Sequence, residues 1–181
     1  MGQHRKLLIE EMNRITVEQF KAAPKTPIII VLDNIRSLNN VGSIFRTCDA
    51  LRVERIVLVG FTSPPPHPEI HKTALGAEDS VEWQQYDNVL TAIENLRSEG
   101  CVICSVEQAE GSVALPDFRV ERGKKYALIL GNEVRGVQQQ AVDASDYCIE
   151  IPQFGTKHSF NVAVTAGIVL WELFRQLKFG R

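Results

Sequence analysis

Three short segments carry the glycines and polar side chains that ligand binding and catalysis require. The first, residues 40–46, is Asn-Val-Gly-Ser-Ile-Phe-Arg and follows an apolar run that ends at Asp33. The second, residues 128–136, is Leu-Ile-Leu-Gly-Asn-Glu-Val-Arg-Gly and places Glu133 between two glycines. The third, residues 151–161, is Ile-Pro-Gln-Phe-Gly-Thr-Lys-His-Ser-Phe-Asn. At the carboxyl edge of an α/β sheet, such segments can form a ligand site.

Each segment also has an ordinary structural explanation. Arg46 falls away from the apolar stripe of its predicted helix, as a solvated surface charge usually does. Gly131 and Gly136 allow close backbone approach to a ligand, but they also suit an ordinary turn after a strand. Asn161 is polar at the start of an apolar helix, where it can serve as a cap. Taken singly, none of these segments establishes a function.

The sequence lacks the glycine-rich loops that bind phosphate groups. It contains no Gly-x-x-x-x-Gly-Lys-Ser/Thr pattern, which excludes a P-loop. The first apolar run ends at Asp33 and continues as Asn-Ile-Arg-Ser, without the Gly-x-Gly-x-x-Gly pattern of dinucleotide-binding domains. A nucleotide-binding α/β enzyme of another class is therefore disfavoured.

The four cysteines do not suggest a metal site. Cys101 and Cys104 have CxxC spacing within a predicted strand, where residues three apart point to opposite faces. No second CxxC completes a zinc site, and His67 and His71 lack the His-Glu-x-x-His order. We therefore expect reduced, buried cysteines and no bound metal.

Composition predicts one globular domain. The chain has 181 residues, 44% of them hydrophobic and 23% charged, with a net charge of −2. This balance argues against a dedicated nucleic-acid binder unless positive charge is local or pooled between subunits. The N-terminus lacks a secretory signal, and the longest apolar stretch, residues 159–174, is too short to span a bilayer. We expect a soluble, cytoplasmic protein without membrane contact.

Alternating β-branched runs and helical patterns predict an α/β fold with a mostly parallel sheet flanked by helices. The expected strands cover residues 27–33, 55–60, 80–84, 101–106, 126–131 and 147–151. The expected helices cover residues 4–22, 41–52, 87–98 and 159–178, with shorter ones at 71–77 and 137–143. The proline-rich residues 61–70 predict a rigid, non-helical loop.

The N-terminal pattern predicts a helical extension at residues 1–25, followed by the main domain at residues 26–181. Thr16 and Gln19 have the spacing of a capping box, which would divide the helix 4–22 in two.

Two further caps are expected at the motif segments. Asn40 is a good cap for the helix 41–52, and Ser159 for the last helix. Glu172, Arg175 and Lys178, the charges of the last helix, form one narrow stripe, so its remaining surface must be buried in the core or by a partner.

In this order, the three segments resemble the signature motifs of the SpoU/TrmH family of RNA 2′-O-methyltransferases, within the SPOUT superfamily. They resemble its Asn-x-Gly-x-Ile-x-Arg element, its Gly-Asn-Glu-x-x-Gly turn and its Ile-Pro … Ser-Leu-Asn-Val entry to the final helix. Residues 72–77 also resemble family sequence, and the likeness extends over about residues 27–175. Phe160 stands where the family most often has Leu, which alters one wall of the implied pocket.

The resemblance implies a SPOUT methyltransferase fold with a C-terminal deep trefoil knot, and a homodimer formed through the knot region and the last helix. It implies S-adenosylmethionine as cofactor, S-adenosylhomocysteine as product and RNA as partner. The implied cofactor-binding residues are Leu130, Gly131, Asn132, Gly136, Ile151, Ser159, Phe160 and Asn161. The implied catalytic residues are Asn40, Arg46, Glu133, Ser159 and Asn161. RNA contacts are expected at Arg36, Asn40, Arg46 and Lys72.

The implied reaction moves a methyl group to a ribose 2′-hydroxyl in structured RNA, with tRNA favoured over rRNA. Arg46 is the family's candidate to activate that hydroxyl, but a guanidinium stays protonated and suits a phosphate clamp better. Glu133 would hold either Arg46 or the ribose. The alternative is a non-catalytic RNA-binding or assembly factor on the same fold.

Overall fold

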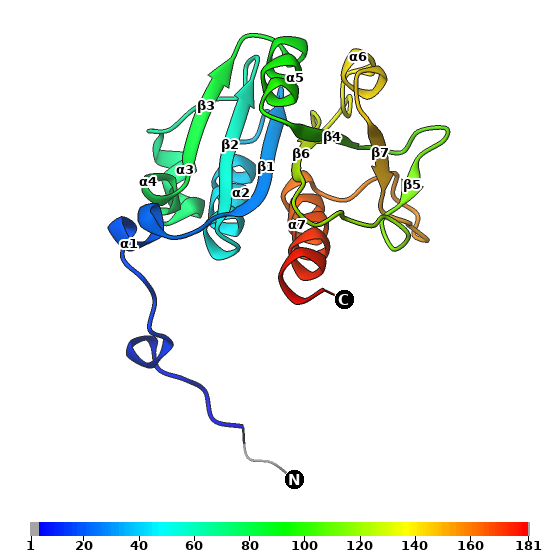
Figure 1. The fold of residues 1–181 in the computed structure, drawn as a ribbon. Helices are drawn as coiled ribbons and strands as arrows, with labels where there is room; N and C mark the ends of the chain where they lie inside the picture. Colours follow the sequence, from blue (N-terminus) through cyan, green and yellow to red (C-terminus); the bar gives the residue numbers. More distant parts are fainter. Residues whose placement is uncertain (1–3, 181) are drawn as a thin grey trace.

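The structure is a computed structural model that describes residues 4–180, built around a seven-stranded sheet (Figure 1). The strand order is β3-β2-β1-β6-β4-β7-β5, and each neighbouring pair is parallel, which confirms the predicted α/β class and sheet. The strands are β1 (Thr26–Asp33), β2 (Val53–Val59), β3 (Glu82–Tyr86), β4 (Cys101–Val106), β5 (Val113–Ala114), β6 (Lys125–Leu130) and β7 (Tyr147–Glu150).

Helices cover both faces of the sheet (Figure 1). One buried core contains side chains of α2 and α7, and a second contains side chains of α5 and α6. The helices are α1 (Val17–Ala22), α2 (Leu38–Ala50), α3 (Pro68–Ala74), α4 (Ala77–Ser80), α5 (Val89–Ser98), α6 (Gln139–Asp143) and α7 (Val162–Phe179), preceded by a 3₁₀ turn η1 (Ile9–Met12).

The central strand β1 shows why the apolar runs are nearly continuous. Ile28, Ile30 and Leu32 enter the core beneath α2 and α7. Ile29 and Val31 point the other way, into the core beneath α5 and α6. Because successive side chains alternate between faces that are both covered, residues 28–32 of the strand are all apolar.

The same alternation separates the CxxC cysteines. Cys101 belongs to the α5 core and Cys104 to the α2 core, so their side chains lie on opposite faces, as predicted. The four cysteines are free thiols, and burial raises the pKa of Cys101 to about 11. Within residues 4–180 no group of three or more His, Cys, Asp or Glu side chains could hold a metal ion. No helix in that range is long and apolar enough to cross a membrane.

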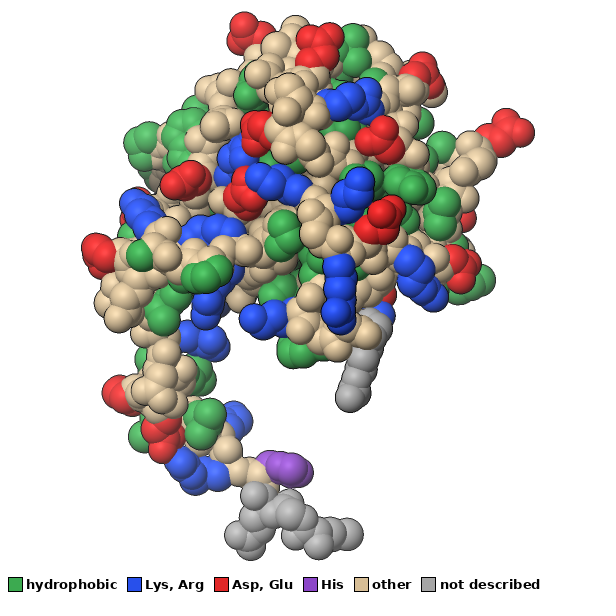
Figure 2. All heavy atoms as spheres, in the orientation of Figure 1, with side chains coloured by type: hydrophobic (Ala, Val, Ile, Leu, Met, Phe, Trp, Pro, Cys, Tyr) green, Lys and Arg blue, Asp and Glu red, His purple; other side chains and the backbone are tan. Residues whose placement is uncertain are grey.

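The predicted helix 4–22 is wrong. Asn13 has a left-handed backbone (φ 48°), so a short 3₁₀ turn and α1 replace one continuous helix. The capping box of Thr16 and Gln19 is present and begins α1, as predicted. Leu8 and Ile9 are exposed because the segment before α1 stands away from the body of the protein (Figure 2). Residues 1–3 of the expected extension lie outside the described range.

Helix starts differ from the predictions in three places. Ser37, not Asn40, caps α2, and its hydroxyl accepts the Asn40 N–H at 3.3 Å. Asn161, not Ser159, caps α7, which confirms the ordinary interpretation of that asparagine. Helix α3 begins at Pro68, inside the predicted loop, because proline suits the first turn of a helix.

Two strands also depart from the predictions. The strand expected at residues 80–84 lies at 82–86, because residues 77–80 form α4. The two-residue strand β5 was not predicted; it pairs with β7 through Val113 and Ala114. A segment this short has too few residues to show strand periodicity.

We predict that α1 contributes to stability and that the segment before it does not. Replacing Phe20, which is 3% exposed, with Ala should lower the free energy of unfolding by about 3–5 kcal/mol. Removing residues 1–13 should leave it nearly unchanged, because none of residues 4–13 is buried. Urea denaturation of both variants tests this; comparable losses would show that the N-terminal segment packs against the protein.

Candidate functional site

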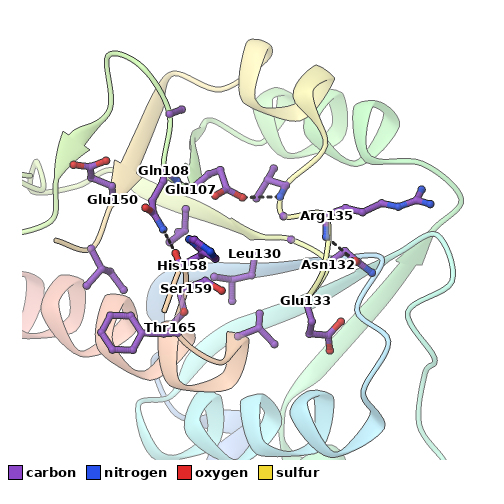
Figure 3. Close-up of a pocket in the computed structure, with 18 of the residues that line it drawn as sticks. Glu107, Gln108, Leu130, Asn132, Glu133, Arg135, Glu150, His158, Ser159 and Thr165 are labelled. Carbon is purple, nitrogen blue, oxygen red and sulfur yellow. Dashed lines mark hydrogen bonds between the residues drawn. The ribbon is translucent and has the colours of Figure 1, made fainter. Parts of the chain in front are cut away.

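A pocket of about 720 Å³ opens where β4, β6 and β7 end (Figure 3). Its walls come from the turn after β6, from the residues after β4 and from Ile151, Gln153 and residues 158–162. This volume suits a ligand of nucleoside size, since small-molecule sites span roughly 300–1,000 Å³. The pocket lies at the carboxyl edge of the sheet, where open α/β sheets bind ligands.

The residues predicted to bind the cofactor come together in this pocket. Eight of them line it: Leu130, Gly131, Asn132, Gly136, Ile151, Ser159, Phe160 and Asn161. Glu133, predicted to be catalytic, also lines it, whereas Asn40 and Arg46 do not. The sequence therefore predicted the pocket wall, and the roles of these residues remain predictions.

Glu133 connects the turn after β6 to the start of α2. One carboxylate oxygen accepts the backbone N–H of Arg36 at 2.9 Å. The other accepts the Ser37 N–H and the Asn40 side-chain amide, each at 3.0 Å. These bonds explain why Asn40 is not the cap of α2: its amide lies inside the first turn and faces Glu133.

Asn161 extends this connection to α7. Its side-chain N–H donates to the Asn40 side-chain oxygen at 3.1 Å. Its own oxygen accepts the N–H groups of Ala163 and Val164, at 2.9 and 3.4 Å, which caps α7. The chain Glu133–Asn40–Asn161 thus joins the three motif segments, and each amide is oriented by its neighbour.

These contacts determine the charge state of Glu133. Burial raises the pKa of its carboxyl group, but the N–H donors of Arg36, Ser37 and Asn40 stabilise the carboxylate, and the net result is a lowered pKa. Glu133 is therefore a charged anchor and a poor proton donor at neutral pH.

The turn after β6 depends on two glycines. A Cβ on Gly131 would lie 2.1 Å from the backbone of Gly136 and Val137. Gly136 has φ +68°, and a Cβ there would lie 2.2 Å from a carboxylate oxygen of Glu107. Asn132 braces the turn, since its side chain accepts two N–H groups and donates to the Asn34 carbonyl at 2.7 Å.

Arg46 lies apart from this group. It is exposed on α2, and between residues 4 and 180 no hydrogen bond or ion pair of its side chain is present. Glu133 does not pair with Arg46 in this structure; its carboxylate accepts N–H groups of Arg36, Ser37 and Asn40, and whether it holds Arg46 or the ribose stays a prediction. Arg36 and Lys72 are exposed, as RNA-contacting residues must be.

Sequence reasoning missed several polar residues around the pocket. Asp33 is fully buried and accepts the Gln138 side-chain amide at 2.7 Å, which ties the end of β1 to the residues after the turn. Burial raises the pKa of Asp33, and its hydrogen bonds from Gln138 and Asn34 oppose this only in part. Glu107 lines the pocket; its place directly after the predicted strand 101–106 was the signal that could have identified it.

We predict that Gly131→Ala disrupts the pocket. The added methyl group overlaps the backbone of Gly136 and Val137, so these residues must move away from residue 131. The hydrogen bonds that Asn132 accepts within the turn would then be distorted. Binding of S-adenosylmethionine, the expected cofactor, should fall below detection. Gly167→Ala is the matched control, because a Cβ there meets nothing within 4 Å and Gly167 does not line the pocket. Isothermal titration of both variants tests this, and unchanged binding by Gly131→Ala would contradict the account.

We also predict that Glu133 stabilises the fold in a pH-dependent way. Its folded pKa is lowered, so its contribution is present above the ordinary carboxyl pKa and is lost as the pH falls through the folded value. Glu133→Gln should cost roughly 1–2 kcal/mol near pH 7 and less in acid. The test is urea denaturation of wild type and Glu133→Gln from neutral to acidic pH. A difference in the free energy of unfolding that grew in acid would refute the prediction.

Comparison with known proteins identifies relatives along most of the chain. A model of the SpoU rRNA Methylase family matches residues 27–171. A tRNA/rRNA methyltransferase described as uncharacterized, from Borreliella burgdorferi, is 31% identical over 89% of this chain and 69% of its own length. The 23S rRNA (guanosine-2′-O-)-methyltransferase RlmB of Neisseria meningitidis serogroup B is 30% identical over 83% of this chain and 59% of its own. The chain spans about two thirds of such curated relatives.

Solved structures agree with this result. The AdoMet-bound rRNA methyltransferase from Sinorhizobium meliloti has a TM-score of 0.79 at 28% identity, over 87% of this chain and 60% of that one. The A. aeolicus TrmH/SpoU tRNA modifying enzyme has a TM-score of 0.77 at 26% identity, over 93% of this chain and 84% of that one. With the family model matched along residues 27–171, the chain belongs to the SpoU rRNA methylase family.

Proposed function

We propose that this protein transfers a methyl group from S-adenosylmethionine to the ribose 2′-hydroxyl of a nucleotide in RNA. The observation that carries the proposal is the hydrogen-bonded chain Glu133–Asn40–Asn161, which unites three family motifs at the edge of one pocket. A relative named as a guanosine-2′-O-methyltransferase and an AdoMet-bound structural neighbour support it.

The pocket fits S-adenosylmethionine. Gly131 and Gly136 line the pocket and carry no side chains, so the lining there is backbone, which can offer the neutral hydrogen bonds that an adenosine needs in a sheltered cleft. Glu107 and Glu150 add carboxylates to the lining, which suit a ligand with sulfonium and ammonium charges. When bound, the cofactor supplies an electrophilic methyl group.

Positioning accounts for most of the proposed catalysis. The ribose oxygen must be held about 3–3.5 Å from the methyl carbon and in line with the bond that breaks. Asn161 and Ser159, at the pocket edge, would orient the ribose, while Glu133 fixes Asn40 and through it Asn161. The bound cofactor would supply the methyl group and leave as S-adenosylhomocysteine, while the proton of the ribose hydroxyl would pass to solvent.

Arg46 would act as a clamp. Its guanidinium stays protonated, so it would bind the phosphate beside the target ribose and stabilise the developing alkoxide. Arg36 and Lys72 would contact RNA along the same edge. Because Arg46 lies outside the pocket of its own chain, the RNA or a second copy of the chain must bring it to the reacting nucleotide.

We further propose a homodimer formed through the knot region and α7. Val164, Trp171 and Phe179 are 50%, 51% and 58% exposed on that helix, and a partner would cover them. A dimer would also pool positive charge. The deep trefoil knot is proposed on the family resemblance. A division into an N-terminal extension at residues 1–25 and a methyltransferase domain at 26–181, and a cytoplasmic location, are proposed from the sequence pattern; residues 1–3 and 181 lie outside the described range.

For the substrate we propose tRNA ahead of rRNA. A structural neighbour named as a tRNA modifying enzyme, the A. aeolicus protein with a TM-score of 0.77, supports this preference. A non-catalytic RNA-binding factor on the same fold is the second candidate, favoured by the distance of Arg46 from the pocket.

The test is transfer of labelled methyl from S-adenosylmethionine to purified tRNA and rRNA pools. Arg46→Ala should lower transfer by about 100-fold or more, because a charge aimed at the transition state is lost. Arg122→Ala, an exposed arginine before β6, is the matched control and should retain transfer. If Arg46→Lys kept most of the rate and only shifted the pH optimum, the clamp would be contradicted.

The outcomes separate the two candidate functions. Label in tRNA alone supports the proposal in full, and label in rRNA alone corrects the substrate. Cofactor binding without transfer to either pool favours the non-catalytic factor. Failure to bind S-adenosylmethionine would overturn the proposed methyltransferase.

A further inference from the structure

Residues 152–160 form a segment without helix or strand that borders the pocket. Gln153, His158, Ser159 and Phe160 line the cavity, and the stretch 154–160 is exposed throughout. The segment is continuous with β7 at one end and with the α7 cap, Asn161, at the other. Between these ends it crosses the cavity edge.

A single hydrogen bond ties this segment to the described remainder of the protein. The side-chain amide of Gln108 donates to the carbonyl oxygen of His158 at 2.6 Å. Gln108 comes from the residues after β4, and Figure 3 shows it reaching across to His158 and Ser159. The contact therefore lies directly before two residues of the predicted cofactor site.

The neighbouring residue, Glu107, holds the opposite wall. Its carboxylate accepts the Val137 N–H at 2.9 Å with one oxygen and the Gln108 N–H at 2.8 Å with the other. It also fills the space beside Gly136 where a Cβ would lie. Consecutive residues at the end of β4 thus reach both walls of the pocket (Figure 3).

Gln108 connects the fixed end of β4 to residues 152–160. The preceding residues Ser105 and Val106 are buried in the sheet, and Glu107 fixes the backbone N–H of Gln108 itself. The base of the Gln108 side chain is therefore held by a buried strand, and its tip binds residues 152–160, which make no other hydrogen bond within residues 4–180.

We propose that Gln108 is a positioning residue that latches residues 152–160 onto the pocket and thereby sets the affinity for S-adenosylmethionine. The proposal rests on the proposed function for the identity of the ligand. Without the latch, Ser159 and Phe160 lose the support before them, so cofactor affinity falls. At saturating cofactor the bound ligand orders Ser159 again, and Asn161 is still held by Asn40 and by its capping bonds, so the reacting groups are in place.

The test uses three variants of the full chain. Gln108→Met keeps the size of the side chain and removes its N–H donor. Gln108→Lys restores a donor of similar reach. Gln85→Met is the matched control, since Gln85 is an exposed glutamine on β3, at the other edge of the sheet.

Three measurements are made on each variant: the Kd for S-adenosylmethionine by calorimetry, amide hydrogen exchange of residues 152–160 without ligand, and the kcat of methyl transfer at saturating cofactor. Gln108→Met should raise the Kd about twofold to tenfold, the range expected for one neutral hydrogen bond. It should also speed exchange in the segment, and its kcat at saturating cofactor should stay near that of wild type. Gln108→Lys should recover both properties, and Gln85→Met should match wild type.

Wild-type Kd and exchange in Gln108→Met would overturn the latch. A faster exchange with unchanged Kd would also overturn it, because the segment would then be held without affecting affinity. If wild type did not bind S-adenosylmethionine, the proposed function would fail, and the exchange of Gln108→Met would alone decide whether Gln108 holds the segment.

Discussion

The carboxylate of Glu133 is the contact on which the site depends. It takes up two backbone N–H groups at the start of α2 and the amide of Asn40, so three donors at the sheet edge share one acceptor group. This is possible only because Gly131 lets the turn after β6 fold tightly back on itself. A buried N–H group left without an acceptor here would cost about as much free energy as two or three hydrogen bonds contribute. The loops that border the pocket would also lose the group that joins them.

Much of this arrangement could be predicted from residue patterns. The apolar run of β1 required covered faces, and the alternation of Ile28 and Ile29 into separate cores meets that requirement. The family resemblance implied that Leu130 and Ile151 share a pocket, and they do; the physical reason is that parallel strands bring their carboxyl ends to one edge. Residues at strand ends can be placed in this way because the sheet topology alone determines where each strand ends.

Other features depend on tertiary contacts that periodicity does not encode. The N-terminal pattern favoured a helix, but none of the side chains of residues 4–13 is buried, and a short helix without packing is unstable. Ser37 and Asn40 are both good caps, and only the position of Glu133 selects between them. The bond from Gln108 to His158 joins residues fifty positions apart, so no local pattern could indicate it.

The side chain of Asn161 has two separate roles. Its oxygen serves the architecture by ending the backbone of α7, and its nitrogen serves the site by orienting Asn40. Aspartate could perform the first task and not the second, and serine is too short to reach in both directions. The two ends of one small amide therefore serve folding and the site separately. A substitution at this position that keeps one of these roles loses the other.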